Sequence, residues 1–162
     1  MNKKIVYLLL ALVLPVLVFV FLRNFGKNQF DIPIYYQEGV TYISSDCSVT
    51  SQGQYLLSDT SLQAIGWRHH NLLLVTDASE VERRELARAC EGSDSSEVQI
   101  IDMNVVVADR LAEWKRCSLF IRDPFKVVLI DDQKRIRGYY ALNSREEIDR
   151  LEVELKILLK KY

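Results

Sequence analysis

The N-terminal part of the chain carries one long apolar run. From Ile5 to Leu22 no residue is charged, and Arg23 and Lys27 follow the run. A helix rises about 1.5 Å per residue, so a helix of this length would just span the apolar core of a bilayer. The apolar part of a cleaved signal peptide is shorter, about 7–15 residues, and no A-x-A-like cleavage site follows this run. The pattern therefore predicts an uncleaved signal-anchor, a transmembrane helix over residues 1–22.

The charges on either side of this run lean slightly towards a cytoplasmic N-terminus under the positive-inside rule. We therefore expect a single-pass protein of the cytoplasmic (inner) membrane, N-in, with its domain in the periplasm. Residues 23–43 are then a juxtamembrane connector and residues 44–162 the folded domain. In the connector, Tyr35 and Tyr36 either sit at the membrane interface or pack on the domain.

After residue 70, short apolar runs alternate with segments of helical periodicity. The expected strands are short apolar runs, at residues 71–76, 97–102, 125–130 and 135–141. The expected helices repeat apolar residues at helical spacing, at residues 79–90, 105–115 and 148–158. The resulting order β-α-β-α-β-β-α predicts an α/β fold with a mixed sheet and flanking helices. Its final hairpin and helix match the C-terminal half of a thioredoxin-like fold.

Two local signals help to place the last elements. Pro124 precedes the third expected strand, where thioredoxin-like folds carry a proline that is usually cis. A trans proline that opens the strand fits the sequence equally well. Ser144 and Glu147 have the spacing of a capping box, which predicts the start of the last helix.

Composition excludes several classes of protein. The 162 residues include 21 Lys+Arg and 22 Asp+Glu, which gives a net charge of -1. A chain with 49% hydrophobic and 27% charged residues has the composition of a folded domain. The balanced charge removes the general electrostatic reason to expect a nucleic-acid partner. The sequence contains no glycine-rich phosphate loop, G-x-S-x-G or H-E-x-x-H motif, so we expect no enzyme activity.

Two stretches together resemble the Sco/SenC family of membrane-anchored, thioredoxin-like proteins. One is the apolar run followed by residues 25–33 (FGKNQFDIP), and the other is residues 128–140 (VLIDDQKRIRGYY) before an acidic helix. Members of this family deliver copper to the CuA centre of cytochrome oxidase or reduce its thiols, using a C-x-x-x-C pair and a histidine. Here residues 77–81 contain no cysteine and residues 121–124 contain no histidine. The resemblance therefore implies the scaffold and a partner near oxidase assembly, but no copper ligand.

The three cysteines, Cys47, Cys90 and Cys117, have none of the short spacings of metal or redox motifs. Buried free thiols are the commoner outcome for such residues. If a disulfide forms in an oxidising compartment, Cys90 with Cys117 is the pairing that we favour. A copper-binding or thiol-redox site with non-standard ligands among these cysteines is the alternative function. Outside that alternative we expect no cofactor and no metal.

Three other residues attract attention without forming a site. His69 and His70 are adjacent at the start of a strand, so their side chains should point to opposite faces and not bind one metal. Asp77 follows the first core strand, where active sites of open α/β sheets lie. An N-cap is the better explanation for this aspartate, because its carboxylate can accept hydrogen bonds from free helix amides.

The function that we expect is non-catalytic binding or scaffolding at a membrane. The candidate partner-binding residues are in the last hairpin: Arg135, Arg137, Tyr139 and Tyr140. The membrane would be contacted through residues 5–22. The protein partner would be an unidentified membrane or periplasmic protein, respiratory if the resemblance holds.

Overall fold

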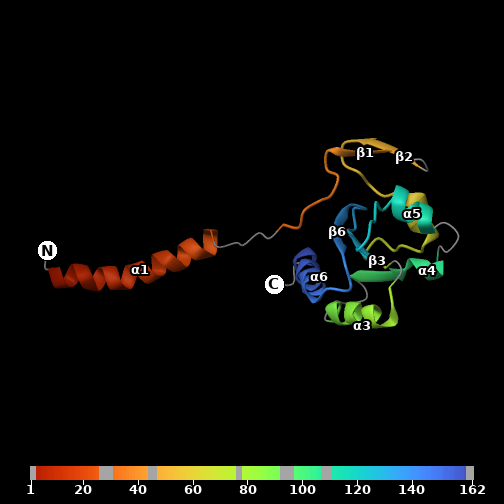
Figure 1. Cartoon of the computed structure of the whole chain (residues 1–162). Coiled ribbons are helices and arrows are strands. Elements are labelled where there is room, and N and C mark those ends of the chain that lie inside the picture. The colour runs from red at the N-terminus through yellow and green to blue at the C-terminus, as the bar shows by residue number, and fades with distance from the viewer. Residues whose placement is uncertain are drawn as a thin grey trace. The chain divides into compact units, whose positions relative to one another are not determined.

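The chain forms two compact units, Met1–Asp31 and Ile32–Tyr162. A computed structural model describes residues 3–25, 31–43, 47–75, 78–91, 97–106 and 111–159. The first unit contains helix α1 (Lys3–Phe25), and the second contains every described strand (Figure 1).

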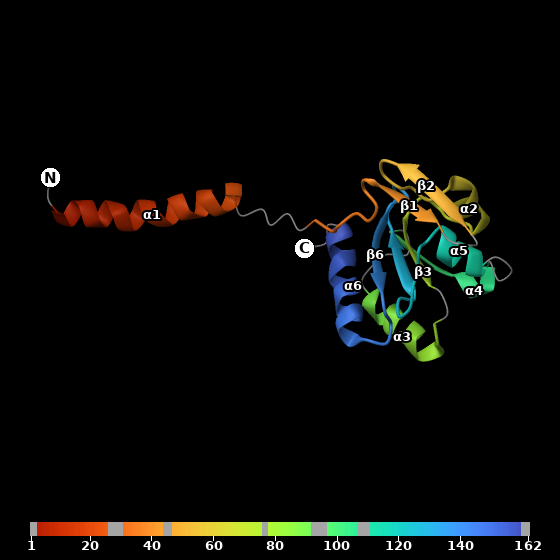
Figure 2. The same cartoon turned by 45° about the horizontal axis from the view of Figure 1, so that its top comes forward.

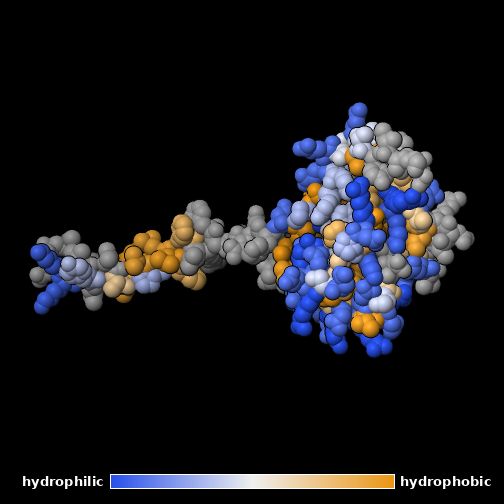
Figure 3. Space-filling model, viewed as in Figure 1, coloured by the Kyte–Doolittle hydropathy of each residue, from blue (hydrophilic) through white to orange (hydrophobic). Residues whose placement is uncertain are grey.

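Helix α1 has Pro15 inside it and exposes its described apolar side chains. Figure 3 shows hydrophobic residues gathered on this helix. Within the part of the chain that the structure describes, however, no helix has the length and apolarity needed to cross a membrane. This finding contradicts the predicted signal-anchor over residues 1–22. It equally contradicts the expected single-pass location in the inner membrane with a periplasmic domain.

The strands of the second unit form two small sheets. The two-stranded sheet is an antiparallel hairpin of β1 (Gly39–Ile43) and β2 (Ser48–Gln52). The four-stranded sheet has the order β4-β3-β5-β6, in which β3 and β4 are parallel and the other neighbours are antiparallel. Its strands are β3 (Asn71–Val75), β4 (Val98–Asp102), β5 (Val127–Ile130) and β6 (Ile136–Tyr140). The helices of this unit are α2 (Asp59–Ala64), α3 (Glu80–Ala89), α4 (Met103–Val106), α5 (Leu111–Cys117) and α6 (Arg145–Leu158).

The order of strands and helices after residue 70 confirms the expected alternation, and the sheet is mixed as predicted. The predicted fold class, a thioredoxin-like sheet preceded by a transmembrane helix, is nevertheless contradicted. The strands are short and divide between two small sheets, because β1 and β2 pair with each other and not with the four-stranded sheet. No described helix could supply the membrane span. The second unit is a small mixed α/β domain.

Strand β5 lies at the centre of the packing, with all four of its residues at 0% exposure. Because side chains alternate across a strand, the side chains of β5 pack in two different cores, one on each face of the sheet. Val128 and Ile130 pack in the core that includes residues of α2 and α5 and residues 35–40, near the start of this unit. Val127 and Leu129 pack in the core formed with α3 and α6. Figure 2 shows α3 and α6 away from α2 and α5, with the sheet between them.

The folded domain begins earlier than the predicted boundary at residue 44. Ile32 is only 3% exposed, and its carbonyl accepts a hydrogen bond of 2.7 Å from Arg137. The backbone N–H of Tyr35 donates to the carbonyl of Ile136 at 2.9 Å. Residues 32–43, which the sequence suggested were a connector, are therefore part of the domain.

Helix α3, and not α6, begins with a capping box. The Ser79 hydroxyl accepts from the backbone N–H of Glu82, and the Glu82 carboxylate accepts from the backbone N–H of Ser79 at 2.7 Å. At α6, Ser144 is the N-cap residue but makes no side-chain cap hydrogen bond. The carboxylate of Glu147 is instead held by Arg150 at 2.9 Å, so the capping box predicted for Ser144 and Glu147 is wrong.

Glu82 also joins α3 to the start of β5. Its two carboxylate oxygens accept from the Lys126 ammonium at 2.9 and 3.1 Å. The hydrogen bond from Lys126, followed by the one from the Ser79 backbone, lowers the pKa of Glu82 from 4.5 to about 2. A carboxyl group with a lowered pKa stabilises the fold above its ordinary pKa and loses that effect as the pH falls through the lowered value.

We predict that Lys126→Met lowers the free energy of unfolding at neutral pH by about 1 kcal/mol, the upper range for a partly exposed ion pair. The difference from the unmodified chain should shrink as the pH falls from about 4.5 towards about 2, where Glu82 becomes protonated. Urea unfolding at several pH values measures it. Lys156→Met, which removes an exposed pair within α6, is the matched control and should change little. A Lys126→Met effect that stays constant down to pH 2 would contradict this account.

Candidate functional site

The hairpin residues chosen from the sequence as partner-binding candidates do not form a surface. Arg137, Tyr139 and Tyr140 are buried, and the side chain of Arg135 is mostly covered. Their polar groups instead serve the fold. The Asp131 carboxylate accepts from Arg135 Nε at 2.7 Å and from Arg137 at 3.3 Å. These residues thus hold the β5–β6 turn, and the hypothesis of a partner surface on them is corrected.

Tyr140 is fully buried and makes two polar contacts at its ring and hydroxyl. The hydroxyl donates to the Glu154 carboxylate at 2.5 Å, and the Arg150 guanidinium lies 4.7 Å from the ring centroid. Burial, followed by the hydrogen bond to Glu154, raises the pKa of this tyrosine well above its usual range. A Cβ on Gly138 would lie 2.7 Å from Cζ of the Tyr140 ring. The glycine of the IRGYY sequence therefore leaves the space that this ring occupies.

Beside the hairpin, the domain has a pocket of about 390 Å³ with mostly aromatic and apolar walls. We call it the aromatic pocket. Two chain segments and β6 line it, through Tyr36, Val40, Thr41, Phe120, Arg122, Phe125 and Tyr139. Of the four hairpin candidates, only Tyr139 reaches it. The other lining residues were not singled out from the sequence as a site, because they are dispersed along the chain and form no local motif.

The walls of the aromatic pocket are built by contacts between rings. The Phe120 ring centroid lies 5.0 Å from that of Tyr36 and 5.1 Å from that of Tyr55. Tyr139 contacts Tyr35 edge-on at 5.1 Å. These distances are in the range where aromatic pairs attract each other. Tyr35 and Tyr36 therefore pack on the domain, which decides between the two alternatives for them.

Two of the aromatic residues that line the pocket have an unusual backbone. Tyr36 has φ of 58° and Phe120 has φ of 53°. The left-handed region is costly for bulky side chains, on the order of 1–3 kcal/mol for each residue. Such residues persist only where their surroundings hold them, and they concentrate at ligand sites. The bond between Asp123 and Pro124, just before Phe125, is cis.

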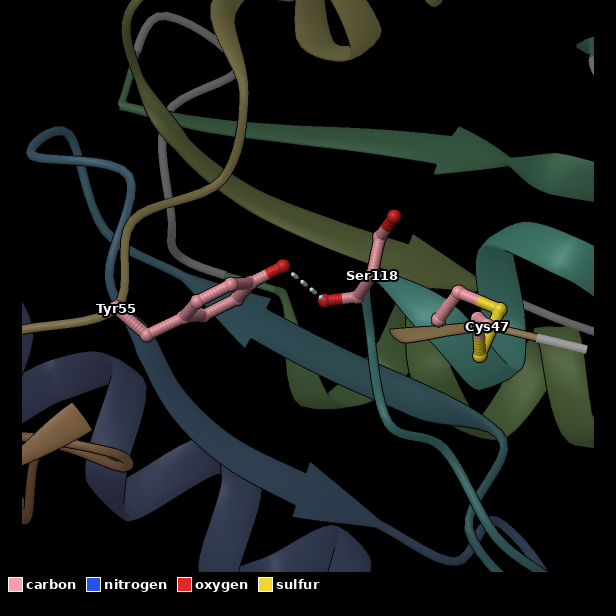
Figure 4. The surroundings of a disulfide bond; sticks show 4 residues. Cys47, Tyr55 and Ser118 are labelled. Carbon is pink, nitrogen blue, oxygen red and sulfur yellow. Dashed lines mark hydrogen bonds between the residues drawn. A yellow bond between two sulfur atoms is a disulfide. The ribbon is translucent and has the colours of Figure 1, made fainter. Parts of the chain in front are cut away.

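The tyrosine hydroxyls around the pocket are used to hold its wall. Tyr139 donates to the carbonyl of Leu119 at 2.8 Å, and Tyr55 donates to the carbonyl of Ser118 at 3.0 Å (Figure 4). Burial raises the pKa of Tyr55 to about 12 and that of Tyr139 further. Both hydroxyls are therefore protonated at neutral pH and act as donors to the backbone, a structural role and not one in proton transfer.

A disulfide joins Cys47 to Cys117, with 5.8 Å between the Cα atoms and a sequence separation of 70 (Figure 4). The favoured pairing of Cys90 with Cys117 is therefore wrong. Cys90 is free and half-buried, at the end of α3, and burial raises the pKa of its thiol to about 11. A thiol with so high a pKa carries little thiolate at neutral pH and is a weak nucleophile and metal ligand.

The cysteines thus offer little to copper in this oxidation state. Two of the three sulfurs are bonded to each other. Among the described residues, no group of three His, Cys, Asp or Glu side chains is placed to hold a metal ion. A copper site using Cys47 or Cys117 would first require reduction of their bond.

The histidines lie at a turn before β3. The centroid of the His69 ring lies 4.3 Å from that of the Trp67 ring, with the two rings tilted, and His69 has φ of 62°. The Trp67 Nε1–H donates to the carbonyl of His70 at 2.9 Å, so this turn is held by Trp67. Asp77, for which the sequence favoured an N-cap role, lies outside the described residues.

Comparison with known protein families and with curated proteins finds no match to this chain. The likeness to the Sco/SenC family therefore rests on the residues quoted for it.

We predict that the unreduced chain contains one titratable thiol after unfolding, and three after reduction and unfolding. In the native state, Cys90 should react slowly with iodoacetamide at pH 7, because its raised pKa leaves little thiolate. Mass spectrometry of the alkylated chain counts the thiols. Three alkylated cysteines without reductant, or a peptide that links Cys90 to another cysteine, would contradict the Cys47–Cys117 bond.

Proposed function

We propose that this chain is a non-catalytic binding domain and that the aromatic pocket holds a short segment of a partner protein. The observation that carries the proposal is the pocket itself: about 390 Å³ enclosed by four aromatic side chains, two apolar or hydroxyl-bearing ones and one arginine. Ligand pockets of proteins start at about 300 Å³ and combine apolar walls with a few polar groups. The aromatic pocket has this composition.

Aromatic walls suit an apolar side chain of the partner. Large rings provide much contact area and lose little conformational entropy when they bind, which is why tyrosine is common at binding hot spots. Tyr36, Phe120 and Tyr139 are already held by one another and by the backbone. A pocket that is ordered before binding loses less conformational entropy on association. A phenylalanine or leucine side chain of the partner would be the anchor.

Arg122 supplies charge selection at this pocket. It is the one charged residue among the seven that line the pocket, and it is exposed. A guanidinium can bind a carboxylate through two parallel hydrogen bonds. The positive charge at this position favours a carboxylate over an ammonium group next to the pocket, so the preferred partner segment has an acidic residue beside its apolar anchor.

The groups around the pocket support binding more than chemistry. The hydroxyls of Tyr55 and Tyr139 donate to backbone carbonyls and are not available for proton transfer. The identity of the partner rests on resemblance alone: the likeness of residues 128–140 to the Sco/SenC family suggests a protein of respiratory oxidase assembly. Fold and motif likeness do not determine function, so this part of the proposal stands apart from the pocket.

We predict that the full chain binds fluorescein-labelled decapeptides with a central Phe flanked by Glu, with micromolar Kd, and binds the Lys-flanked version at least tenfold more weakly. Phe125→Ala and Arg122→Gln should each weaken binding of the Glu-flanked peptide about tenfold, equivalent to about 1.4 kcal/mol. Fluorescence anisotropy gives the affinities. Val153→Ala, at an exposed apolar position on α6, is the matched control and should leave the Kd unchanged.

The proposal fails if neither peptide binds, or if the control variant weakens binding as much as Phe125→Ala. Equal affinity for the Glu- and Lys-flanked peptides would remove the role of Arg122 and leave only an apolar pocket.

A further inference from the structure

We propose that the Cys47–Cys117 disulfide sets the shape of the aromatic pocket, so that its reduction by a dithiol weakens partner binding. This inference rests on the proposed binding function and adds its regulation. It is carried by the position of the bond, which lies outside the pocket and joins Cys47, just before β2, to Cys117 at the end of α5. Both ends lead to residues that line the pocket: β2 pairs with β1, and the chain after α5 reaches Phe120.

One end of the bond holds the hairpin that forms one wall. Cys47 lies between β1 and β2, and β1 provides Val40 and Thr41 to the pocket. The hydrogen bonds that described residues of this hairpin make run between its two strands and to the turn at Tyr36. Val40 and Val49 pack against the core only partly buried. The disulfide therefore adds a covalent link from this small sheet to α5, beside the packing of Val40 and Val49 and the hydrogen bonds at Tyr36.

The other end of the bond leads directly into the opposite wall. Cys117 is the last residue of α5, and the chain then passes through Ser118 and Leu119 to Phe120. The carbonyls of Ser118 and Leu119 accept the hydroxyls of two tyrosines of the aromatic cluster. Phe120 follows in its left-handed conformation and lines the pocket. A shift of Cys117 would thus reach Phe120 in the pocket wall through two intervening residues, the first of which, Ser118, is drawn in Figure 4 with its hydrogen bond to Tyr55.

A reductant reaches the bond most directly at Cys47, which is half-buried, since Cys117 is only 8% exposed. Cys117 lines a second surface pocket, of about 330 Å³, between α2 and α5, together with Ser61, Glu113 and Trp114. A thiolate of a dithiol would attack one sulfur, form a mixed disulfide and release the other cysteine as a thiolate, which takes up a proton. The second thiol of the reductant then displaces the protein sulfur. The dithiol is oxidised to a disulfide, and Cys47 and Cys117 are left as two thiols.

Reduction would change the pocket by releasing its restraint. Without the cross-link the β1–β2 hairpin samples more positions, so a smaller fraction of molecules has both walls in place. The apparent Kd rises in inverse proportion to that fraction. A fall in the competent fraction to about one tenth would weaken binding about tenfold.

The test uses the full chain in three forms: oxidised, reduced with dithiothreitol, and as the Cys47→Ser variant. Cys90→Ser, which keeps the disulfide, is the matched control. Hydrogen–deuterium exchange should rise several-fold in residues 39–43 and 118–122 in the reduced and Cys47→Ser forms, and stay unchanged in α6. The Glu-flanked peptide should bind both forms about tenfold more weakly than it binds the oxidised chain and Cys90→Ser.

Three results would overturn the inference: unchanged exchange at residues 118–122 on reduction, loss of protection in α6 as well, which means general unfolding, or equal peptide affinity in both redox states. Absence of peptide binding to the oxidised chain is a different failure, because it refutes the proposed function. In that case the exchange data still decide whether the disulfide controls the pocket walls.

Discussion

A buried carboxylate, Asp131, is the point on which the arrangement of this domain depends. Its side chain is 2% exposed and that of Arg137 is 7% exposed, so both charges are removed from water. Asp131 accepts hydrogen bonds from Arg135 and Arg137 side chains and from two backbone N–H groups of the turn. Nη2 of Arg137 donates to the carbonyl of Ile32 at 2.7 Å. Loss of one partner of such a pair costs about 3–5 kcal/mol, because it leaves the other charge buried and unpaired.

This network connects parts of the chain that are far apart in sequence. Through Arg137 it holds the segment at Ile32, which lies 105 residues away. The same segment pairs at Tyr35 with Ile136, and the chain after β2 pairs at Leu57 with Lys134. The N-terminal side of the aromatic pocket is therefore placed by the β5–β6 hairpin. The hairpin thus positions Tyr36 and Tyr139, while its own arginines are turned to the fold and not to the surface.

The elements that could be predicted from the sequence are those whose signal is local. β5 could be predicted because its four residues form a continuous apolar run, and the structure buries all four. α6 could be predicted from the helical spacing of Leu151 and Leu155, which are both buried. The pairing of Cys47 with Cys117 and the burial of Arg137 depend on partners 70 and 105 residues away, which no local pattern encodes. At Ser144 the local signal was present, but Arg150 took the Glu147 carboxylate. The aromatic pocket could not be predicted either, because the residues of its walls are far apart in sequence and meet only in the folded chain.

The strain in the pocket wall bears on what the pocket is for. Phe120 has a left-handed backbone. The carbonyls of the two residues before it, Ser118 and Leu119, accept tyrosine hydroxyls, and the disulfide holds Cys117, three positions earlier. Packing alone favours closing such a space, because closure would bury more of the Tyr36 and Phe125 rings. The tyrosine hydrogen bonds to Ser118 and Leu119 fix the chain just before Phe120 against such a movement. Under the proposed function, an apolar side chain of the partner would cover these rings in place of closure and so offset part of the free energy that the left-handed backbone costs.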